Sequence, residues 1–117
     1  GVVSLTTSTH FFPKSVERPL NQLYLVALEI PFGCTITAID HVTRSGSITA
    51  TYYIGSTAYT QGTAITSGSG SVTSTQATLT PSGANTVSAG QHLQVVFSSN
   101  SLAKGLEITA KYTRTIS

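Results

Sequence analysis

Charged side chains are scarce in this sequence, and their scarcity excludes several classes of function. Only 9% of the residues are charged, with six Lys and Arg against four Asp and Glu. The six cations are scattered along the chain, whereas a surface that binds nucleic acid gathers Lys and Arg on one face. We therefore expect no nucleic-acid partner.

Groups that could catalyse a reaction or hold a metal are also few. The four acidic residues fall on separate expected elements, whereas catalysis by paired carboxylates needs two acids across a substrate. Asp40 and His41 are adjacent, but neighbouring side chains on a strand point to opposite faces. The three histidines show no metal-ligand spacing, and Cys34 is the only cysteine, so neither a zinc cluster nor an internal disulfide is expected. The sequence predicts no enzyme activity, no metal and no cofactor.

Long apolar runs are missing as well. A spanning helix needs about 18 or more apolar residues, and the longest run here, LYLVALEI, carries Glu29. We expect no membrane insertion. The absence of methionine, with Gly1 at the start, suggests a processed chain or an excised domain.

Hydroxyl side chains supply most of the polarity that is present. The chain has 20 Thr and 16 Ser, interleaved with Val, Ile, Leu, Tyr and Phe. Disordered segments lack such apolar residues, and Thr favours strands through its β-branched carbon. A chain of 117 residues therefore predicts one folded, β-rich domain.

Alternation of apolar and polar residues marks the expected strands. In the stretch 106–116, Leu106, Ile108, Ala110 and Tyr112 share one face with Ile116, and only Arg114 breaks this inward-facing set. The stretch 90–99 precedes it, and polar residues 98–105 would turn the chain, which predicts a closing β-hairpin.

The middle of the chain gives further strands. Ile48, Ala50, Tyr52 and Ile54 are predicted to face inward, with Tyr53 outward. The stretch 35–44 is expected to be a strand with a β-bulge near 37–40, and 72–80 another strand. The nearly continuous apolar stretch 20–30 predicts a central strand buried on both faces or a subunit contact. The sequence SGSGS at 67–71 is typical of a flexible loop.

Strands separated by turn signals every 8 to 12 residues are typical of a β-sandwich. We predict an all-β fold, a single antiparallel β-sandwich that is either a jelly roll or immunoglobulin-like. Residues 1–20 are expected to be an N-terminal arm or first strand, with a first strand at 2–6, and residues 21–117 the sandwich domain. The predicted core consists of Leu25, Ile36, Ile48, Tyr52, Ile54, Leu93, Val95, Phe97, Leu106, Ile108 and Tyr112.

Aromatic side chains are the remaining candidates for a functional surface. Tyr53 and Tyr59 are predicted to form a platform for a sugar ring, assisted by His41 or Gln61. Tyrosines at such positions also commonly cover the margin of a core or a subunit contact.

Several segments resemble a family of phage structural domains. They are the Pro31–Gly33 turn before TITAI, the Ser-Gly turn before SITATYYIG, the segment NTVSAGQHLQVVFSSNS and the closing LEITAKYTR. The stretch 30–114 thereby resembles domains of head-spike, head-fibre and tail-fibre proteins and of related gene-transfer particles, although Gln91 stands where relatives commonly carry Asp. The resemblance implies a non-enzymatic component of the virion, an extracellular particle.

Two functions follow as expectations. The first is a virion structural protein, such as a capsid decoration, head-spike or fibre domain, which binds copies of itself and other virion proteins. Phe11, Phe12, Leu23 and Leu25 are its predicted assembly contacts. The alternative is an adhesin or lectin-like module that binds a host surface glycan.

Overall fold

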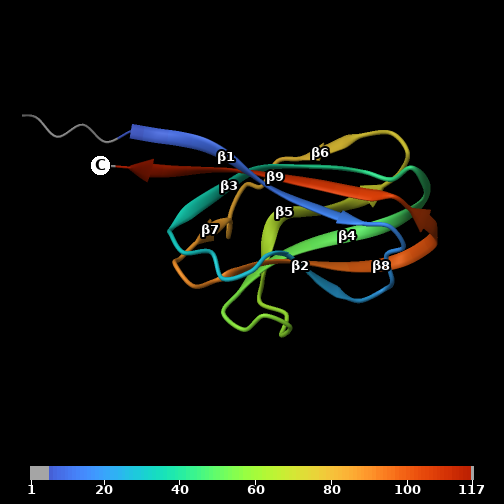
Figure 1. Ribbon diagram of the computed structural model, residues 1–117, viewed down its shortest axis with the longest axis horizontal. Coiled ribbons are helices and arrows are strands. Elements are labelled where there is room, and N and C mark those ends of the chain that lie inside the picture. Colours follow the sequence, from blue (N-terminus) through green and yellow to red (C-terminus); the bar gives the residue numbers. More distant parts are fainter. Residues whose placement is uncertain (1–5, 117) are drawn as a thin grey trace, which may run out of the picture.

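Two antiparallel β-sheets packed face to face make up the protein. The computed structural model describes residues 6–116. Figure 1 shows one sheet above the other in this view, with β1 and β2 on the near side. The strands are β1 (Thr6–Val16), β2 (Leu23–Ala27), β3 (Cys34–Val42), β4 (Ser45–Gly55), β5 (Thr63–Val72), β6 (Ala77–Leu79), β7 (Thr86–Val87), β8 (His92–Lys104) and β9 (Leu106–Ile116).

The order of the strands identifies the topology as a jelly roll. The first sheet runs β1-β9-β3-β6, with the short β7 also pairing with β3, and the second runs β2-β8-β4-β5. Without β7, consecutive strands alternate between the sheets except for β4 and β5, which are paired in the second sheet, and this is the order of a jelly roll, in which two Greek keys interleave. The predicted all-β sandwich is therefore confirmed, and the topology decides between its two forms.

The core lies between the sheets, where the predicted alternation is observed. Ile48, Ala50, Tyr52 and Ile54 of β4 are all buried, and Tyr53 lies on the other face. Every residue of the predicted core is buried except Leu25, which is half-buried. Val26 occupies the inward position instead, so the assignment of Leu25 to the core is wrong by one residue of register.

The expected closing hairpin is also wrong. β8 continues to Lys104, and only Gly105 separates it from β9, but β8 pairs with β2 and β4 whereas β9 pairs with β1 and β3. The chain changes sheet at Gly105, whose φ of 63° is a left-handed value that glycine adopts readily. The residues 98–105 therefore end a long strand and form a corner between the sheets.

Two further expectations differ from the structure. The segment 67–71 is part of β5 and pairs with β4, so it is not a flexible loop. Within the apolar stretch 20–30 only β2 is a strand, and it lies at the edge of the second sheet, with Leu20 and Leu28 exposed. An apolar run alone does not distinguish a central strand from an edge strand.

The N-terminal region is a strand rather than a separate arm. β1 pairs with β9 over its whole length and includes the Phe11-Phe12 pair and Pro13. Most of the predicted first strand at 2–6 lies outside the described residues. The predicted bulge is confirmed, because the pairing of β3 with β9 shifts register between Ile36 and Ala38.

Candidate functional site

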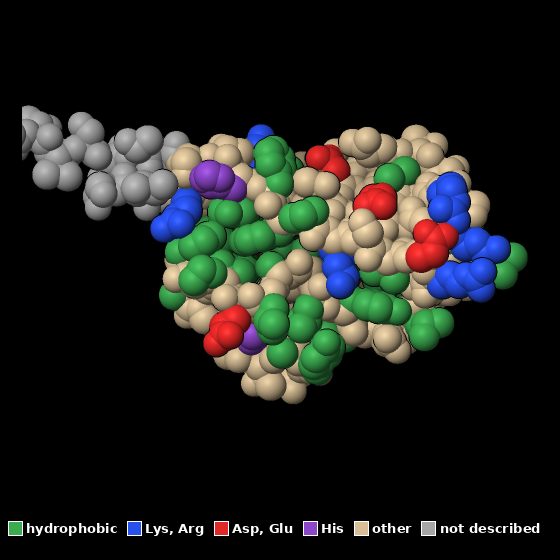
Figure 2. Space-filling model, viewed as in Figure 1, with side chains coloured by type: hydrophobic (Ala, Val, Ile, Leu, Met, Phe, Trp, Pro, Cys, Tyr) green, Lys and Arg blue, Asp and Glu red, His purple; other side chains and the backbone are tan. Residues whose placement is uncertain are grey.

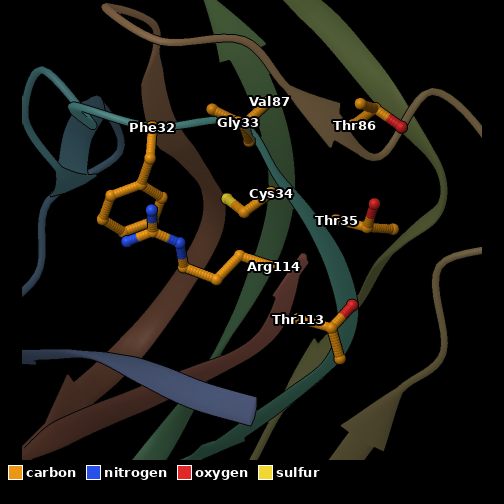
Figure 3. A pocket seen from close by; sticks show the side chains of 8 residues that line it. All are labelled: Phe32, Gly33, Cys34, Thr35, Thr86, Val87, Thr113 and Arg114. Carbon is orange, nitrogen blue, oxygen red and sulfur yellow. The ribbon is translucent and has the colours of Figure 1, made fainter. Parts of the chain in front are cut away.

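One hollow bordered by the described residues lies close to the C-terminal end of β9. It is an open depression of about 430 Å³, and we call it the Arg114 depression. Figure 3 shows the Arg114 side chain reaching toward the Phe32 ring on one side, with Cys34 between this pair and the threonines on the other. Its lining residues are Phe32, Gly33, Cys34, Thr35, Thr86, Val87, Thr113 and Arg114.

The strand register explains why three hydroxyls border this depression. Thr35 of β3 is paired with Thr113 of β9 on one side and with Thr86 of β7 on the other. Residues directly opposite one another in a sheet project from the same face, so the three threonines form one row across three strands. None of them is fully buried, and each hydroxyl can donate and accept a hydrogen bond.

Arg114 is held by an aromatic ring rather than by an acid. Its guanidinium carbon lies 3.9 Å from the centre of the Phe32 ring, which is a cation–π contact. The Phe32 ring in turn lies 5.7 Å from the ring of Tyr112. The Nε atom of Arg114 is buried and has no hydrogen-bond partner among the described residues.

The thiol beside it is not an activated nucleophile. Cys34 is buried, and burial raises the pKa of its thiol, although the nearby Arg114 charge opposes this shift. A thiol with a raised pKa holds less of the reactive thiolate at neutral pH.

The interior holds one polar pair that bridges the sheets. Nδ1 of His41 on β3 lies 3.1 Å from the Tyr52 hydroxyl on β4, and both side chains are fully buried. Burial lowers the pKa of His41, and Asp40 opposes this shift. His41 is therefore a core residue, which corrects its assignment to a glycan-binding surface: an inward position on β3 cannot reach the outer face of β4.

The loop that carries Tyr59 is held by a buried amide. Gln94 of β8 has no solvent exposure, and its Nε2 donates to the carbonyl oxygens of Thr57, Ala58 and Thr60 at 2.9, 3.1 and 2.9 Å. The backbone N–H of Gly62 donates to the Oε1 of Gln94 at 3.0 Å. These four bonds fix the loop 56–62 against the sheet, with Tyr59 74% exposed.

The other predicted glycan residues have mixed positions. Tyr53 lies half-buried on the outer face of β4, at one end of this loop, and Gln61 is exposed within the loop. Tyr53, Tyr59 and Gln61 thus belong to one region of the second sheet, and their role in binding sugar stays a prediction. Neither Gln94 nor Arg114 was predicted as functional, although the break that Arg114 makes in the inward-facing set of β9 marks its position.

Of the predicted assembly residues, Phe11 lies on the edge strand β1, and Leu23 and Leu25 lie on the edge strand β2. We use the name β1–β2 edge for Phe11, Leu20, Leu23, Leu25 and Leu28, of which Phe11, Leu20 and Leu28 are more than half exposed. Figure 2 shows hydrophobic side chains gathered on this side of the molecule. Phe12 does not belong to this surface, because its ring stacks on Tyr112 with 4.1 Å between the ring centres.

Two further features are absent from residues 6–116. No group of three or more His, Cys, Asp and Glu side chains in this range could hold a metal ion. Over the same range, no helix has the length and apolarity needed to cross a membrane.

Comparison with known proteins gives matches by structure alone. No protein-family model and no curated protein matches the sequence. The chain is similar to a chain of the cyanophage Pam1 capsid asymmetric unit, with a TM-score of 0.47 and 15% identity over 97% of this chain and 88% of that one. It is also similar to a family two carbohydrate esterase from Cellvibrio japonicus, with a TM-score of 0.38 and 12% identity over 96% of this chain but 35% of the esterase. At these scores neither structure assigns a function to this chain.

Proposed function

We propose that this chain is a non-enzymatic structural module of a virion, and that it assembles with copies of itself through the β1–β2 edge. The observation that carries the proposal is the apolar, unpaired edge strand β2 of the jelly roll. β2 pairs with β8 on one side only among the described strands, and its outer positions and flanks carry the leucines Leu20, Leu23, Leu25 and Leu28.

The two strands at this edge differ in their capacity to accept a further strand. β1 carries Pro13 and Lys14, and both proline and lysine discourage pairing at a sheet edge. β2 has the sequence LYLVA, with no proline and no charge. Its unpaired backbone groups and apolar side chains therefore make β2 the favoured site for contact.

A second copy of the chain is the occupant that fits this strand. In a two-fold contact the same patch meets itself, so any charge on the patch would face a like charge. β2 brings no charged side chain into such a contact. Full burial of an exposed leucine is worth about 1.5–3 kcal/mol of transfer free energy, part of which offsets the entropy lost on association, and repetition in a closed assembly multiplies the contact.

Two observations support a virion as the setting. The stretch 30–114 resembles phage head-spike, head-fibre and tail-fibre domains in its turns and strands, and the jelly roll is a fold that viral capsid proteins use widely. The position of the chain within the particle distinguishes the decoration, spike and fibre roles. Mass spectrometry of purified particles from the source of the sequence should find this chain in a fixed ratio to the capsid protein. Its absence from intact particles would contradict the virion role.

Sedimentation velocity tests the assembly surface. The wild-type protein is expected to associate as its concentration rises, and Leu25→Lys is expected to weaken association by about 10- to 100-fold, because it replaces an apolar contact with a charge. Ser71→Lys, an exposed position on the opposite edge strand β5, is the matched control and should associate normally. A wild-type protein that stays monomeric, or a Ser71→Lys variant as impaired as Leu25→Lys, would contradict the proposed surface.

Glycan binding is the second candidate function, and the fixed loop 56–62 favours it. Gln94 holds this loop with four hydrogen bonds, and Tyr59 projects from it with 74% of its surface exposed. A preformed loop avoids part of the ordering cost of binding, and a tyrosine ring offers an apolar face to a sugar. The loop itself, STAYTQG, has no charge, which suits a neutral sugar.

A glycan array separates the two candidates. A multivalent form of the protein that binds reproducibly, and that loses binding in Tyr59→Ala and Tyr53→Ala, would establish the adhesin. A blank array with intact assembly would favour the purely structural role.

A further inference from the structure

We propose that two copies of the chain pair their β2 strands antiparallel about a two-fold axis at Tyr24, so that the two second sheets join into one continuous sheet. This inference rests on the proposed assembly through the β1–β2 edge and goes beyond it, because it assigns the register and the symmetry of the contact. Three features of the segment 18–29 carry it: the direction of its free backbone groups, the spacing of its leucines and the charges at its two ends.

The first feature is the direction of the backbone groups of β2. The N–H of Phe97 on β8 donates to the carbonyl oxygen of Gln22 at 3.1 Å, so Gln22 faces β8. Alternate residues of an antiparallel strand face the same partner, so Tyr24 also faces β8, while Leu23 and Leu25 turn their N–H and C=O groups toward the open edge. If Leu23 of one copy lies opposite Leu25 of the other, these groups form four hydrogen bonds and Tyr24 lies opposite itself. An axis at Tyr24 is thus the register in which the two leucines of β2 satisfy each other across the contact.

The second feature is the spacing of the leucines. Leu23 and Leu25 lie one residue on either side of Tyr24. Leu20 and Leu28 lie four residues on either side, where they are 57% and 63% exposed. Antiparallel pairing about Tyr24 places each leucine of one copy beside a leucine of the other, with Leu20 next to Leu28. The same register that pairs the backbone groups therefore also removes the exposed leucines from water.

The third feature is the charge at the two ends of this segment. Arg18 precedes the first of the four leucines, Glu29 follows the last, and both side chains are exposed. The ion pair found within residues 6–116 joins Glu17 to Arg44, and neither Arg18 nor Glu29 takes part in it. An axis at Tyr24 exchanges the two ends, so Arg18 of each copy comes near Glu29 of the other. A parallel pairing would instead bring like charges together, so the charges favour the antiparallel arrangement.

Disulfide trapping tests the register. Leu23→Cys and Leu25→Cys are prepared as separate proteins in a Cys34→Ala background, one of them isotope-labelled, and are mixed under mild oxidation at a concentration at which the wild type associates. Directly opposite residues lie about 5.5 Å apart between Cα atoms, within reach of a disulfide, whereas two copies of one position would lie about 8 Å apart, beyond that reach. We expect the mixed disulfide to exceed either homodimer disulfide by about 10-fold or more.

Exchange of the end charges gives an independent readout by sedimentation. Arg18→Glu and Glu29→Arg should each weaken association by about 3- to 10-fold, because each change brings like charges together twice in the dimer. The double variant that carries both changes should associate nearly as well as the wild type. Ser71→Glu adds an acid on β5, at the opposite edge of the second sheet, and should associate normally.

The outcomes separate this inference from the assembly on which it rests. Association that Leu25→Lys weakens, but that gives no excess of the mixed disulfide or no rescue by the double charge variant, would overturn the register and leave the β1–β2 edge as the contact. Homodimer disulfides as abundant as the mixed one would overturn the axis at Tyr24. A wild-type protein that stays monomeric would overturn both proposals. Thermal unfolding of each variant at low concentration checks that a loss of association does not come from a loss of the fold.

Discussion

The two open sides of this sandwich are built from different side chains. On one side lie β1 and β2, with exposed leucines and Phe11, and on the other lie β5 and β6, whose outer positions are mainly serine, threonine and glycine. Both sides end in edge strands with backbone groups available for pairing. Only the first offers apolar side chains that a partner would bury.

This difference shows how the same fold can offer a contact surface at one edge and none at the other. Short polar side chains on β5 keep that edge hydrated, and Thr51 and Ser69 hydrogen-bond each other there at 2.9 Å. Pro13 protects β1 from strand addition, so the unprotected strand is β2. A domain with one attractive edge and one inert edge can form a limited assembly instead of an unlimited stack.

A substitution in the core between the sheets should have the largest effect on the free energy of unfolding. Leu106→Ala removes a side chain with no solvent exposure and should reduce the free energy of unfolding by about 2–5 kcal/mol. Chemical denaturation followed by circular dichroism measures it. A loss below 1 kcal/mol would mean that the sheets are not packed as described.

A substitution of Gly68 on the edge strand β5 should have the next largest effect on stability. A Cβ on Gly68 would lie 2.8 Å from the Cβ of Ile65 and 2.9 Å from its carbonyl oxygen, so Gly68→Ala should cost about 1–3 kcal/mol of stability. Ser71→Ala, at an exposed position of the same strand, is the control and should change stability little. Equal tolerance of both changes would show that 67–71 behaves as a linker after all.

The buried His41–Tyr52 pair between the sheets should make the free energy of unfolding depend on pH. Because burial lowers the pKa of His41, the unfolded chain takes up a proton near pH 6.5 while the native chain does not. The free energy of unfolding should therefore fall as pH drops below about 6.5 and should level off below the native pKa of His41. Denaturation at a series of pH values measures this slope. His41→Gln should remove the part of the slope that belongs to this residue, and an unchanged slope would contradict the assignment.

The smallest effect on stability is expected at the apolar edge itself. Leu25 is half-buried and projects away from the core, so Leu25→Lys should change the free energy of unfolding of the dilute monomer by about 0.5 kcal/mol or less. Thermal unfolding at low concentration checks this. A large destabilisation would mean that Leu25 supports the fold and would invalidate it as a probe of assembly.

The interior was predictable from local pattern, because alternation depends on residues two apart in one strand. β4 and the inward-facing set of β9 follow directly from it. The sheet to which a strand belongs depends on partners far away in sequence, so local pattern alone predicts a hairpin at the β8–β9 corner at Gly105. Serine and glycine favour loops, so the sequence predicts a loop at 67–71. In the structure this segment is part of β5, and Gly68 packs so closely against Ile65 that a larger side chain would not fit.

The candidate site was less predictable than the fold. His41 was placed at the surface because polar residues are usually exposed, yet its partner Tyr52 lies on the opposite sheet and becomes visible only after the sheets pack. Gln94 likewise bonds a loop more than thirty residues earlier in the chain. Arg114 breaks the inward-facing pattern of β9, but the row of threonines on the opposite face of the sheet depends on the pairing of three strands.

Hydrogen–deuterium exchange at low and high protein concentration tests the central claim most directly, because it observes the backbone groups of both edges in one sample. The account predicts that amides of β2, 23–27, become protected as concentration rises while those of β5, 63–72, exchange at the same rate throughout. Protection that appears at β5 instead, or at neither edge, would contradict the assignment of the contact to the β1–β2 edge.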